Sequence, residues 1–463
     1  MPSQQSLCVH AHFYQPPRED PISGIIPVEK GAWPYQNWNE KVFDTCYKPN
    51  VDLGNFNKIS FNIGPTLSNW LEVAHPDTLK KIIQADQSNM EHFGVGNAIS
   101  QSYNHSILPL ANRRDKRTQV IWGIYSFQRT FKRKPQGMWL PETAVDLETL
   151  SMLAENGIEF TILAPWQADT TDLDIRQVYQ VQLPDHRSIK VFFYHSGISS
   201  RISFDPDITQ NADRFIHEVL KTEYSGEDTH QMLVVASDGE LYGHHQSFRD
   251  KFLSHLLNGA LSAHHIDPSF PALQLRKQIT FPLIKIKENT SWSCHHGIER
   301  WKGVCGCSPD GQWKASLRSA LDWLSKQLDS ILFEVGAGFF PSLWRSRDKF
   351  IEVVLGEWEF SDWLESQACG HVSPENAARL HSLLLAQVEK HKMFTSCGWF
   401  FDDFDRIEPR NNVIHASYAV WLTKQGSGVD LAPEVSSLLA QVKSPVTGLT
   451  ADQVFNEALA RLN

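Results

Sequence analysis

QMLVVASDGELYGHH (231–245) places an apolar run directly before a group of residues that are costly to bury. Residues 231–235 predict a buried β-strand. The polar residues that follow it are Asp238, Glu240, His244 and His245. Gly239 and Gly243 let the backbone turn tightly beside them. A carboxyl group in such surroundings can have a raised pKa and act as a general acid, whereas the alternative is an Asp/Gly turn with incidental histidines.

Short apolar runs of the same kind recur through the first 290 residues and alternate with amphipathic segments. The predicted strands are 7–14, 58–64, 90–96, 137–142, 160–165, 189–195 and 231–238. Predicted helices between them include 145–157 and 248–259, each of which we expect to end at a glycine. Strands that alternate with helices indicate a parallel sheet with helices outside it.

Polar side chains gather at the carboxyl ends of several predicted strands. They are His10, His12, Asn62, Asn97, Glu142, Asp238 and Glu240. In α/β barrels the active site lies at this rim, so we expect these residues to converge on one mouth. The alternative is that each is a loop residue in water.

The segment KPQGMWLPETAVD (134–146) supplies one of these carboxylates. Pro141 cannot donate a ladder hydrogen bond, so strand pairing should stop there and leave Glu142 at the strand mouth, near Trp139. A carboxylate beside an indole suits nucleophilic or acid–base work on a sugar. The alternative is that Glu142 stabilises the N-terminus of the next helix.

HAHFYQPP (10–17) follows the first predicted strand. His10 and His12 are two residues apart, so they face the same side of a strand. This arrangement suits a divalent metal ion, as in metal-dependent hydrolases, and it equally suits hydrogen bonds to sugar hydroxyls. The residues alone leave both open.

The chain changes character near residue 290. Amphipathic helices are predicted over 314–335, 373–391, 411–426 and 449–462. Ser373 is the expected N-cap of the second of these, and Thr450 with Gln453 forms a capping box at the start of the last. We therefore predict an N-terminal domain over 1–290 and a helical domain over 291–463.

Two stretches of the helical domain mix aromatic and polar residues without helical periodicity, HGIERW (296–301) and CGWFFDDFDR (397–406). Their candidate substrate-binding residues are His296, Trp301, Trp399, Asp402 and Asp403. Trp can stack on a sugar ring and Asp can bind hydroxyls. The alternative is packing between the helices and the barrel.

Cys294, Cys305, Cys307 and Cys397 lie in or beside these stretches. A C-x-C pair near another Cys and a His pair can bind zinc, but the spacing fits no standard two-plus-two knuckle. We therefore predict a packed loop or a cleft wall, no metal site and no cofactor.

Composition and charge limit the classes of partner that the protein is expected to bind. The chain has 463 residues, 41% of them hydrophobic, and a net charge of -10 with acidic and basic residues mixed along it. Nucleic-acid and membrane-surface binders need a basic field, so neither partner is expected, and a neutral substrate fits. No secretory signal or bilayer-spanning run is expected, and the 7 cysteines indicate a reducing cytoplasm. The oligomeric state is not indicated.

Taken in order, HAHFYQPP, GMWLPE and SDGELYGHH resemble the motifs of glycoside hydrolase family 57, over nearly the first 250 residues. The carboxy-terminal stretches resemble an uncharacterised branch of that family. The resemblance implies a (β/α)7 barrel followed by a helical domain that closes over the cleft. It also implies a retaining mechanism on an oligo- or polysaccharide.

The resemblance assigns roles to individual residues. It makes Glu142 the nucleophile and Asp238 the acid/base. It places His10, His12, Gln15, Glu240 and His244 in the sugar-binding pocket. The residue patterns add Asn97, Trp139 and His245 as further substrate-binding candidates on the barrel. The first motif has two extra residues between His12 and Gln15, and the segment 94–112 lacks the acidic residue of glucan-active members.

We therefore predict a retaining glycoside hydrolase or transglycosylase acting on α-linked glucans or oligosaccharides. The carboxyl groups of Glu142 and Asp238 should lie about 5–6 Å apart, as in retaining enzymes. One alternative is a metal-dependent carbohydrate hydrolase or deacetylase with His10, His12 and Asp238 as ligands. Another is a non-catalytic carbohydrate-binding protein.

Overall fold

The computed structural model describes residues 5–224, 230–308 and 310–463, which fall into two compact units. The first comprises the chain up to Gln15, Val28–Tyr103 and Ser126–Trp292. The second comprises Pro16–Pro27, Asn104–Tyr125 and Ser293–Asn463. The predicted single domain boundary at residue 290 stays a prediction. Two N-terminal segments, Pro16–Pro27 and Asn104–Tyr125, cluster with the C-terminal helices.

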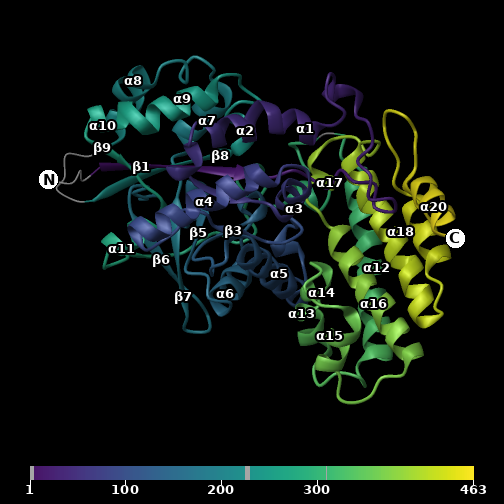
Figure 1. The fold of residues 1–463 in the computed structure, drawn as a ribbon. Coiled ribbons are helices and arrows are strands. Elements are labelled where there is room, and N and C mark those ends of the chain that lie inside the picture. Colours follow the sequence, from purple (N-terminus) through teal and green to yellow (C-terminus); the bar gives the residue numbers. More distant parts are fainter. Residues whose placement is uncertain (1–4, 225–229, 309) are drawn as a thin grey trace. The chain divides into compact units, whose positions relative to one another are not determined.

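A series of parallel strands runs through the first unit. Its members, each beside the next, are β8 (Gln231–Asp238), β1 (Gln5–Phe13), β2 (Ser60–Ile63), β3 (Ser100–Gln101), β4 (Met138–Trp139), β5 (Phe160–Leu163) and β7 (Ser188–Phe193). Figure 1 shows β1 and β8 side by side. The His195 N–H, just after β7, donates to the Val234 carbonyl of β8 at 2.6 Å. The predicted (β/α)7 barrel is confirmed.

Shorter strands extend this framework. β6 (Val178–Gln182) pairs antiparallel with β7, β10 (Leu283–Ile284) pairs with β6, and β9 (Ile266–Pro268) pairs with the start of β1. These strands were not predicted.

Side-chain alternation along β1 and β8 decides which residues face which core. One hydrophobic cluster takes Leu7, Val9, Ala11 and Phe13 from β1, and Leu233 and Val235 from β8. The other takes Cys8, Met232, Val234 and Ala236, together with Trp139 and Phe160. Because successive side chains of a strand point to opposite faces, His10, His12 and Asp238 fall on the face of this second cluster. The even-numbered residues of β1 and β8 therefore share one face, which carries the polar side chains at the carboxyl ends of these strands.

The helices of the first unit include α3 (Pro65–Ala74), α4 (Pro76–Phe93), α6 (Leu147–Glu155), α7 (Ser196–Phe204) and α9 (Arg249–His255). The predicted strand over 90–96 is wrong, because α4 continues through Phe93 and ends at Gly94, whose φ is 70°. The predicted helix stop at Gly259 is also wrong, since a π-helical turn over Leu256–Ala260 carries the helix onward. Apolar residues alone do not separate a strand from the last turn of a helix.

The second unit is helical, as predicted. α12 (Trp313–Gly336), α16 (Pro374–Lys392) and α18 (Ile407–Ser427) pack against one another, and α20 (Ala451–Leu462) packs on α18 (Figure 1). α5 (Arg113–Phe131) contributes its first part to this unit. The Ser373 side chain caps α16, and Thr450 with Gln453 forms the predicted capping box of α20. Among the described residues, no helix has the length and apolar character needed to span a membrane.

Candidate active site

Strand register places polar residues side by side at the carboxyl ends of the central strands. His12 on β1 is the register partner of Asp238 on β8 and of Asn62 on β2. Neighbouring residues at one register level point to the same side of a sheet, so these three side chains share one face. The Asn62 amide also contacts His12 Nδ1 at 2.9 Å.

The row continues beyond β2. Asn62 Nδ2 donates to Gln101 Oε1 at 2.8 Å, and Gln101 is the register partner of Trp139 on β4. The Trp139 ring is buried and stacks on His10 and His12, with centroids 4.7 and 5.3 Å away. Trp139 therefore orients the two histidines. Its predicted substrate contact stays a prediction, because the rings of His10, His12 and Trp292 all lie against it.

Glu142 lies just past β4 in a strained turn. Leu140 is extended, but Glu142 has φ 56° and ψ 19°, and Thr143 has φ 49°. Left-handed backbone is costly for residues other than glycine and concentrates at functional sites. The indole N–H of Trp292 donates to Glu142 Oε2 at 3.0 Å. The carboxylate thus has a fixed orientation on a backbone that must be held in place.

Gln167 provides that restraint. Its Oε1 accepts hydrogen bonds from Thr143 Oγ1 at 2.9 Å and from the Ala164 N–H at 2.8 Å. Its Nε2 donates to the Thr143 carbonyl at 2.8 Å and to Thr290 Oγ1 at 3.2 Å. The side chain is fully buried. Sequence reasoning missed Gln167, because only the fold brings this residue to the turn.

Asp238 ends β8, and the residue as a whole is exposed there. Loss of water around the carboxyl group, together with the negative charge of Glu142, raises its pKa to about 7. Asp238 is therefore partly protonated at neutral pH, as a general acid should be. The separation of about 5–6 Å predicted for the two carboxyl groups stays a prediction.

Glu240 occupies a different environment from Asp238. The chain leaves the strand at Asp238 and enters a 3-10 turn over Gly239–Leu241, so the alternation of an extended chain does not apply. Glu240 is buried, and its Oε1 accepts bonds from Tyr47 Oη at 2.7 Å and the Tyr14 N–H at 3.2 Å. Burial raises its pKa to about 8, partly opposed by the Tyr47 bond.

Gln15 belongs to the same network, since its Nε2 donates to Tyr47 Oη at 3.0 Å. Tyr47 lies on a π-helical turn over Phe43–Tyr47 and was not predicted. Through Tyr47, the first motif and the third motif are joined by consecutive hydrogen bonds. Gln15 and Glu240 are thus brought together as expected, with Gln15 acting on Glu240 through the tyrosine.

His10 and His12 are neutral at physiological pH, because burial lowers the pKa of His10 to about 3 and that of His12 to about 4. His10 Nδ1 bonds to Ser60 Oγ at 2.9 Å. Within the described part of the chain, the side chains that converge as a metal-ligand group of three or more are Cys294, His296, Cys305 and Cys307. The metal-centre alternative built on His10, His12 and Asp238 therefore lacks its ligand geometry.

His244 and His245 lie farther along the third motif. His244 Nδ1 bonds to Thr45 Oγ1 at 3.0 Å, and its ring meets the Trp38 ring edge-on at 5.8 Å. His245 is exposed and packs against His244, with ring centroids 5.1 Å apart. Burial lowers the pKa of His244 to about 4. Side-chain contacts of His244 and His245 thus hold the segment after Glu240 in place.

The prediction for Asn97 is wrong in its placement. Asn97 precedes β3 and is buried, and its Nδ2 donates to the carbonyls of Phe56 and Ile59 at 2.7 and 2.5 Å. The strand was predicted over 90–96, but β3 is Ser100–Gln101. Asn97 therefore lies before the strand and not at its carboxyl end. Gln101 takes the position at the carboxyl end.

The candidate residues of the second unit bond within that unit. Trp301 and Trp399 are buried, so neither ring presents a face for stacking on a sugar. Asp402 Oδ1 accepts from Ser308 Oγ at 2.5 Å, and Asp403 Oδ1 accepts from Ser444 Oγ at 2.7 Å. These contacts hold Asp402 and Asp403 within the second unit, and both substrate contacts and packing against the barrel stay predictions. His296 lies beside Cys305 and Cys307.

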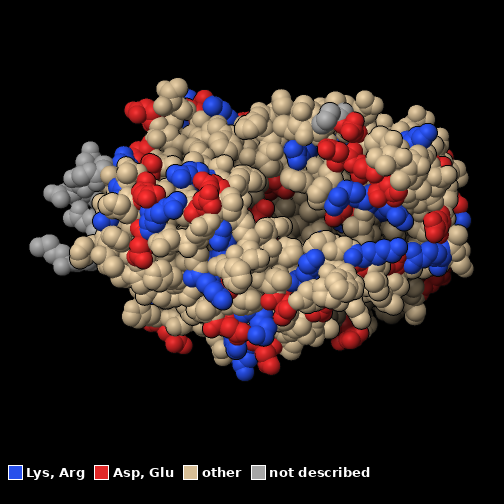
Figure 2. Space-filling model, turned by 90° about the horizontal axis from the view of Figure 1, so that it is seen from above, with Lys and Arg blue, Asp and Glu red and all other residues tan. Residues whose placement is uncertain are grey.

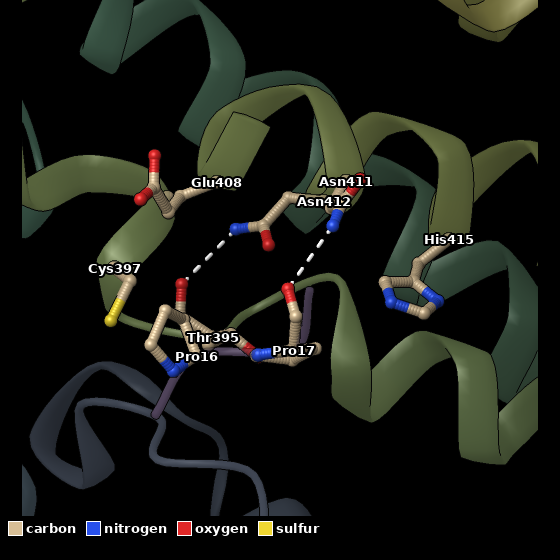
Figure 3. A pocket seen from close by; sticks show the side chains of 9 residues that line it. Pro16, Pro17, Thr395, Cys397, Glu408, Asn411, Asn412 and His415 are labelled. Atoms are coloured by element: carbon tan, nitrogen blue, oxygen red, sulfur yellow. Dashed lines mark hydrogen bonds between the residues drawn. The ribbon is translucent and has the colours of Figure 1, made fainter. Parts of the chain in front are cut away.

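Cys397 stands apart from the other three cysteines of the carboxy-terminal stretches. It lines a small pocket with Pro16, Pro17 and residues of α18 (Figure 3). There Asn411 Nδ2 donates to the Pro17 carbonyl at 3.1 Å, and Asn412 Nδ2 donates to the Thr395 carbonyl at 3.1 Å. The end of the first motif is therefore held by the helical unit.

Charge on the surface is mixed. Figure 2 shows acidic and basic side chains interspersed over the face it presents. This distribution agrees with a net charge of -10 spread along the chain.

Comparison with models of known protein families identifies the family of this chain. A sequence model of glycosyl hydrolase family 57 matches residues 28–277, and a model of a domain of unknown function (DUF3536) matches residues 310–460. The family 57 match covers more than half of the chain, so the chain belongs to glycosyl hydrolase family 57.

Individual relatives are more distant. Alpha-amylase 1 of Dictyoglomus thermophilum is 25% identical over 212 residues, which are 44% of this chain and 29% of the amylase. The chain thus spans less than a third of that relative's length.

Solved structures share the fold over nearly the whole chain. An exo-type maltose-forming amylase from Pyrococcus sp. ST04 has a TM-score of 0.76 at 15% identity, covering 98% of this chain and 88% of that one. A family 57 branching enzyme from Pyrococcus horikoshii has a TM-score of 0.63 at 16% identity, covering 99% and 94%.

Proposed function

We propose that this protein is a retaining glycoside hydrolase or transglycosylase acting on α-linked glucans or oligosaccharides. Glu142 is the nucleophile and Asp238 is the acid/base. The observation that carries the proposal is the geometry at the strand ends: Asp238 ends β8, and Glu142 lies just past β4 with Oε2 held by the Trp292 indole N–H at 3.0 Å. Burial and the negative charge of Glu142 raise the pKa of Asp238 to about 7, which suits the general acid of a retaining mechanism.

In the first step a Glu142 carboxylate oxygen attacks the anomeric carbon, and the bond from that carbon to the glycosidic oxygen breaks. Asp238 transfers its proton to the departing oxygen. The Trp292 indole N–H donates to Glu142 Oε2 at 3.0 Å and so orients the carboxylate for the attack. The product is a covalent glycosyl–Glu142 ester and an ionised Asp238.

In the second step Asp238 accepts a proton from water or from the hydroxyl of an acceptor sugar. That oxygen attacks the anomeric carbon, and Glu142 departs as a carboxylate. Water gives hydrolysis, and a sugar gives transglycosylation. The neutral imidazoles of His10 and His12 keep positive charge away from the site and serve hydroxyl groups as hydrogen-bond partners.

The substrate class is supported by the relatives. Those named above are amylases and a branching enzyme, and a 4-alpha-glucanotransferase from Thermococcus litoralis also shares the fold, with a TM-score of 0.58. The first unit offers neutral hydrogen-bonding groups, which suit an uncharged sugar.

Azide rescue of matched variants tests the two roles. Glu142→Ala should lose turnover of an aryl α-maltoside, and azide should restore it with a β-glycosyl azide as product, since azide replaces the nucleophile in one displacement. Asp238→Ala should give an α-glycosyl azide, because the ester on Glu142 still forms. Glu155→Ala on α6 is the control for Glu142, since Glu155 is exposed.

Wild-type turnover in Glu142→Ala would overturn the assignment of the nucleophile. A panel of maltooligosaccharides, with products resolved by size, separates hydrolysis from transfer. Release of acetate from acetylated sugars without cleavage of any glycoside would favour the deacetylase alternative. Binding of the panel without any turnover would favour a carbohydrate-binding protein.

A further inference from the structure

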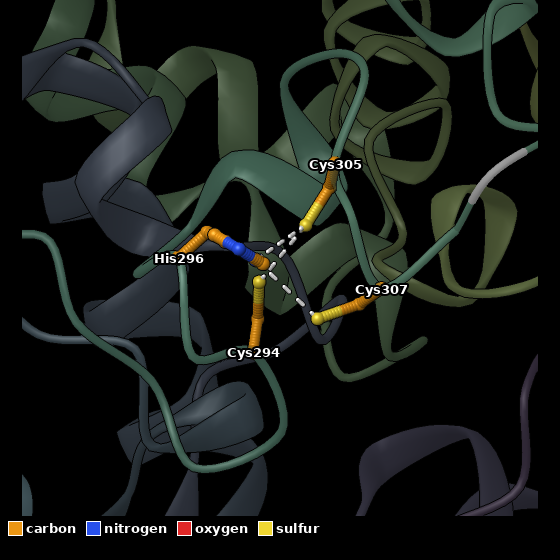
Figure 4. Close-up of side chains that lie close together, drawn as sticks. All are labelled: Cys294, His296, Cys305 and Cys307. Atoms are coloured by element: carbon orange, nitrogen blue, oxygen red, sulfur yellow. Dashed lines mark hydrogen bonds between the residues drawn. The ribbon is translucent and has the colours of Figure 1, made fainter.

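A cysteine-rich loop in the second unit gathers four potential metal ligands. Cys294, His296, Cys305 and Cys307 lie between β10 and α12, where the described residues form one regular element, a 3-10 turn over Glu299–Trp301. Their side chains point toward one another in Figure 4. A loop of this length with so little secondary structure needs another source of order.

The ligand atoms of the four residues lie within 4.8 Å of one another. Cys294 Sγ and Cys305 Sγ are 3.4 Å apart, and His296 Nδ1 is 3.2 Å from Cys305 Sγ and 3.4 Å from Cys307 Sγ. Ligands at zinc–sulfur and zinc–nitrogen bond lengths define a tetrahedron with edges of about 3.5–3.8 Å. These three separations are a few tenths of an ångström below such edges, and the other pairs reach at most 4.8 Å, so small side-chain adjustments accommodate the ion.

The sulfur separation also excludes a disulfide as the arrangement seen. A disulfide bond is about 2.05 Å long, much shorter than the distance between Cys294 Sγ and Cys305 Sγ. All three cysteines of the cluster are free thiols in the structure. Three thiols facing one imidazole nitrogen are a ligand set that selects zinc.

The backbone permits this convergence at two glycines. A Cβ atom on Gly306, between Cys305 and Cys307, would lie 3.2 Å from His296 Cε1, so a side chain there would crowd the imidazole. Gly297 follows His296 with φ 78°, a conformation that favours glycine. Both positions serve the approach of His296 to the cysteines.

Neighbouring cations suit the charge that a bound ion would create. Three thiolates and Zn²⁺ carry a net charge of -1. The Lys314 side chain is buried and its charge interacts with Cys294 and Cys305, and Arg300 Nη2 donates to the Cys307 carbonyl at 3.4 Å. A buried ammonium group offsets that negative charge at close range.

We infer that Cys294, His296, Cys305 and Cys307 bind one structural zinc ion, with three sulfur ligands and His296 Nδ1. Binding deprotonates the three thiols and releases three protons as the Zn–S bonds form. All four positions are filled by protein, which is the mark of a structural site rather than a catalytic one. The spacing, C-x-H with a later C-x-C, differs from that of a two-plus-two zinc knuckle, so the sequence did not indicate this site.

Metal content of the full chain is the test. Protein expressed in zinc-supplemented medium and purified without chelator should contain about one zinc per chain by mass spectrometry of the elements. Cys307→Ser and His296→Ala should lose most of it. Cys369→Ser is the matched control, since Cys369 is an exposed cysteine outside the cluster, and it should keep the wild-type content. This readout is independent of the proposed enzymatic activity.

Cobalt substitution keeps the test decisive if a variant does not fold. Wild-type protein stripped of metal and titrated with Co²⁺ should develop thiolate-to-cobalt charge-transfer absorption that saturates at one equivalent. Metal-free wild-type protein from zinc-rich medium, or saturating cobalt without that absorption, would overturn the inference. So would zinc content in Cys307→Ser equal to that of Cys369→Ser, or a Cys294–Cys305 disulfide in the purified protein.

Discussion

Trp292 holds Glu142 at both its side chain and its backbone. The indole N–H donates to Glu142 Oε2 at 3.0 Å, and the Trp292 backbone N–H donates to the Glu142 carbonyl at 2.9 Å. A nucleophile gains rate from being held in one orientation, and the second contact also braces the left-handed backbone of Glu142. Trp292 is therefore a positioning residue for the proposed nucleophile.

Trp292→Phe should lower kcat by roughly 10- to 100-fold, since a hydrogen bond to a charged group contributes about 1.5–3 kcal/mol. KM should change less, because the indole N–H contacts Glu142. The measurement is kcat and KM on a maltooligosaccharide, once one is known to be turned over. Trp70→Phe is the control, since Trp70 packs on the hydrophobic cluster of the first unit. Equal kcat in the two variants would contradict the role of Trp292.

The left-handed backbone at Glu142 should reverse the usual order of stability between an alanine and a glycine variant. At an ordinary helical or extended position alanine is more stable than glycine, but φ is 56° here. Glu142→Gly should therefore be more stable than Glu142→Ala by about 1 kcal/mol. Urea denaturation of the two inactive variants measures the difference. A more stable alanine variant would show that the left-handed conformation is not held in solution.

Gln167→Ala should reduce both stability and activity. It removes the acceptor for Thr143 Oγ1 and the donor to the Thr143 carbonyl, leaving buried groups without partners at a cost of about 1–3 kcal/mol each. We expect a lower urea midpoint and a lower kcat. Gln182→Ala is the control, because Gln182 is exposed on β6. A destabilised variant with unchanged kcat would limit Gln167 to a structural role.

The pH profile should report Asp238. The proposed first step needs the protonated acid, so kcat/KM should fall as pH rises through about 7, the pKa of Asp238. Glu142→Gln removes one cause of the raised pKa, and the Asp238 carboxyl should then titrate at lower pH. Carbon NMR of labelled aspartate checks this shift. An unchanged pKa in Glu142→Gln would mean that the two carboxyl groups do not interact.

Stability should depend on pH in the sense opposite to that of an ordinary ion-paired carboxylate. Folding raises the pKa of Asp238 from 3.8 to about 7, so the folded state binds more protons between these values. The stabilising contribution is fully present below the lower pKa and is lost as pH rises through the upper one.

Asp238→Asn removes this titration. The variant should gain stability relative to the wild type at pH 8 and gain less at pH 4.5. Urea midpoints at the two pH values give the comparison, with Asp185→Asn as an exposed control. A gain that is constant with pH would contradict a raised pKa for Asp238.

Most of the correct predictions of strands and helices came from short local motifs. The strand over 231–238 was predicted with the bounds that β8 has, because an apolar run that ends in Asp-Gly marks its own limit. The helices beginning at Ser373 and Thr450 were predicted because capping acts over a few residues. The strand predicted over 90–96 failed because a few apolar residues in a short segment do not separate a strand from the last turn of a helix.

The sequence by itself determined the barrel class, the order of the motifs and the two carboxylates, since each is encoded within a short segment. Only the tertiary structure decided that Trp292 holds Glu142, that Gln167 holds the neighbouring Thr143 and that Tyr47 bonds to Glu240, because each approaches from a distant segment with no local signal in the sequence. It likewise decided that Cys294 and His296 face Cys305 and Cys307, since an irregular loop has no periodicity from which side-chain direction can be inferred.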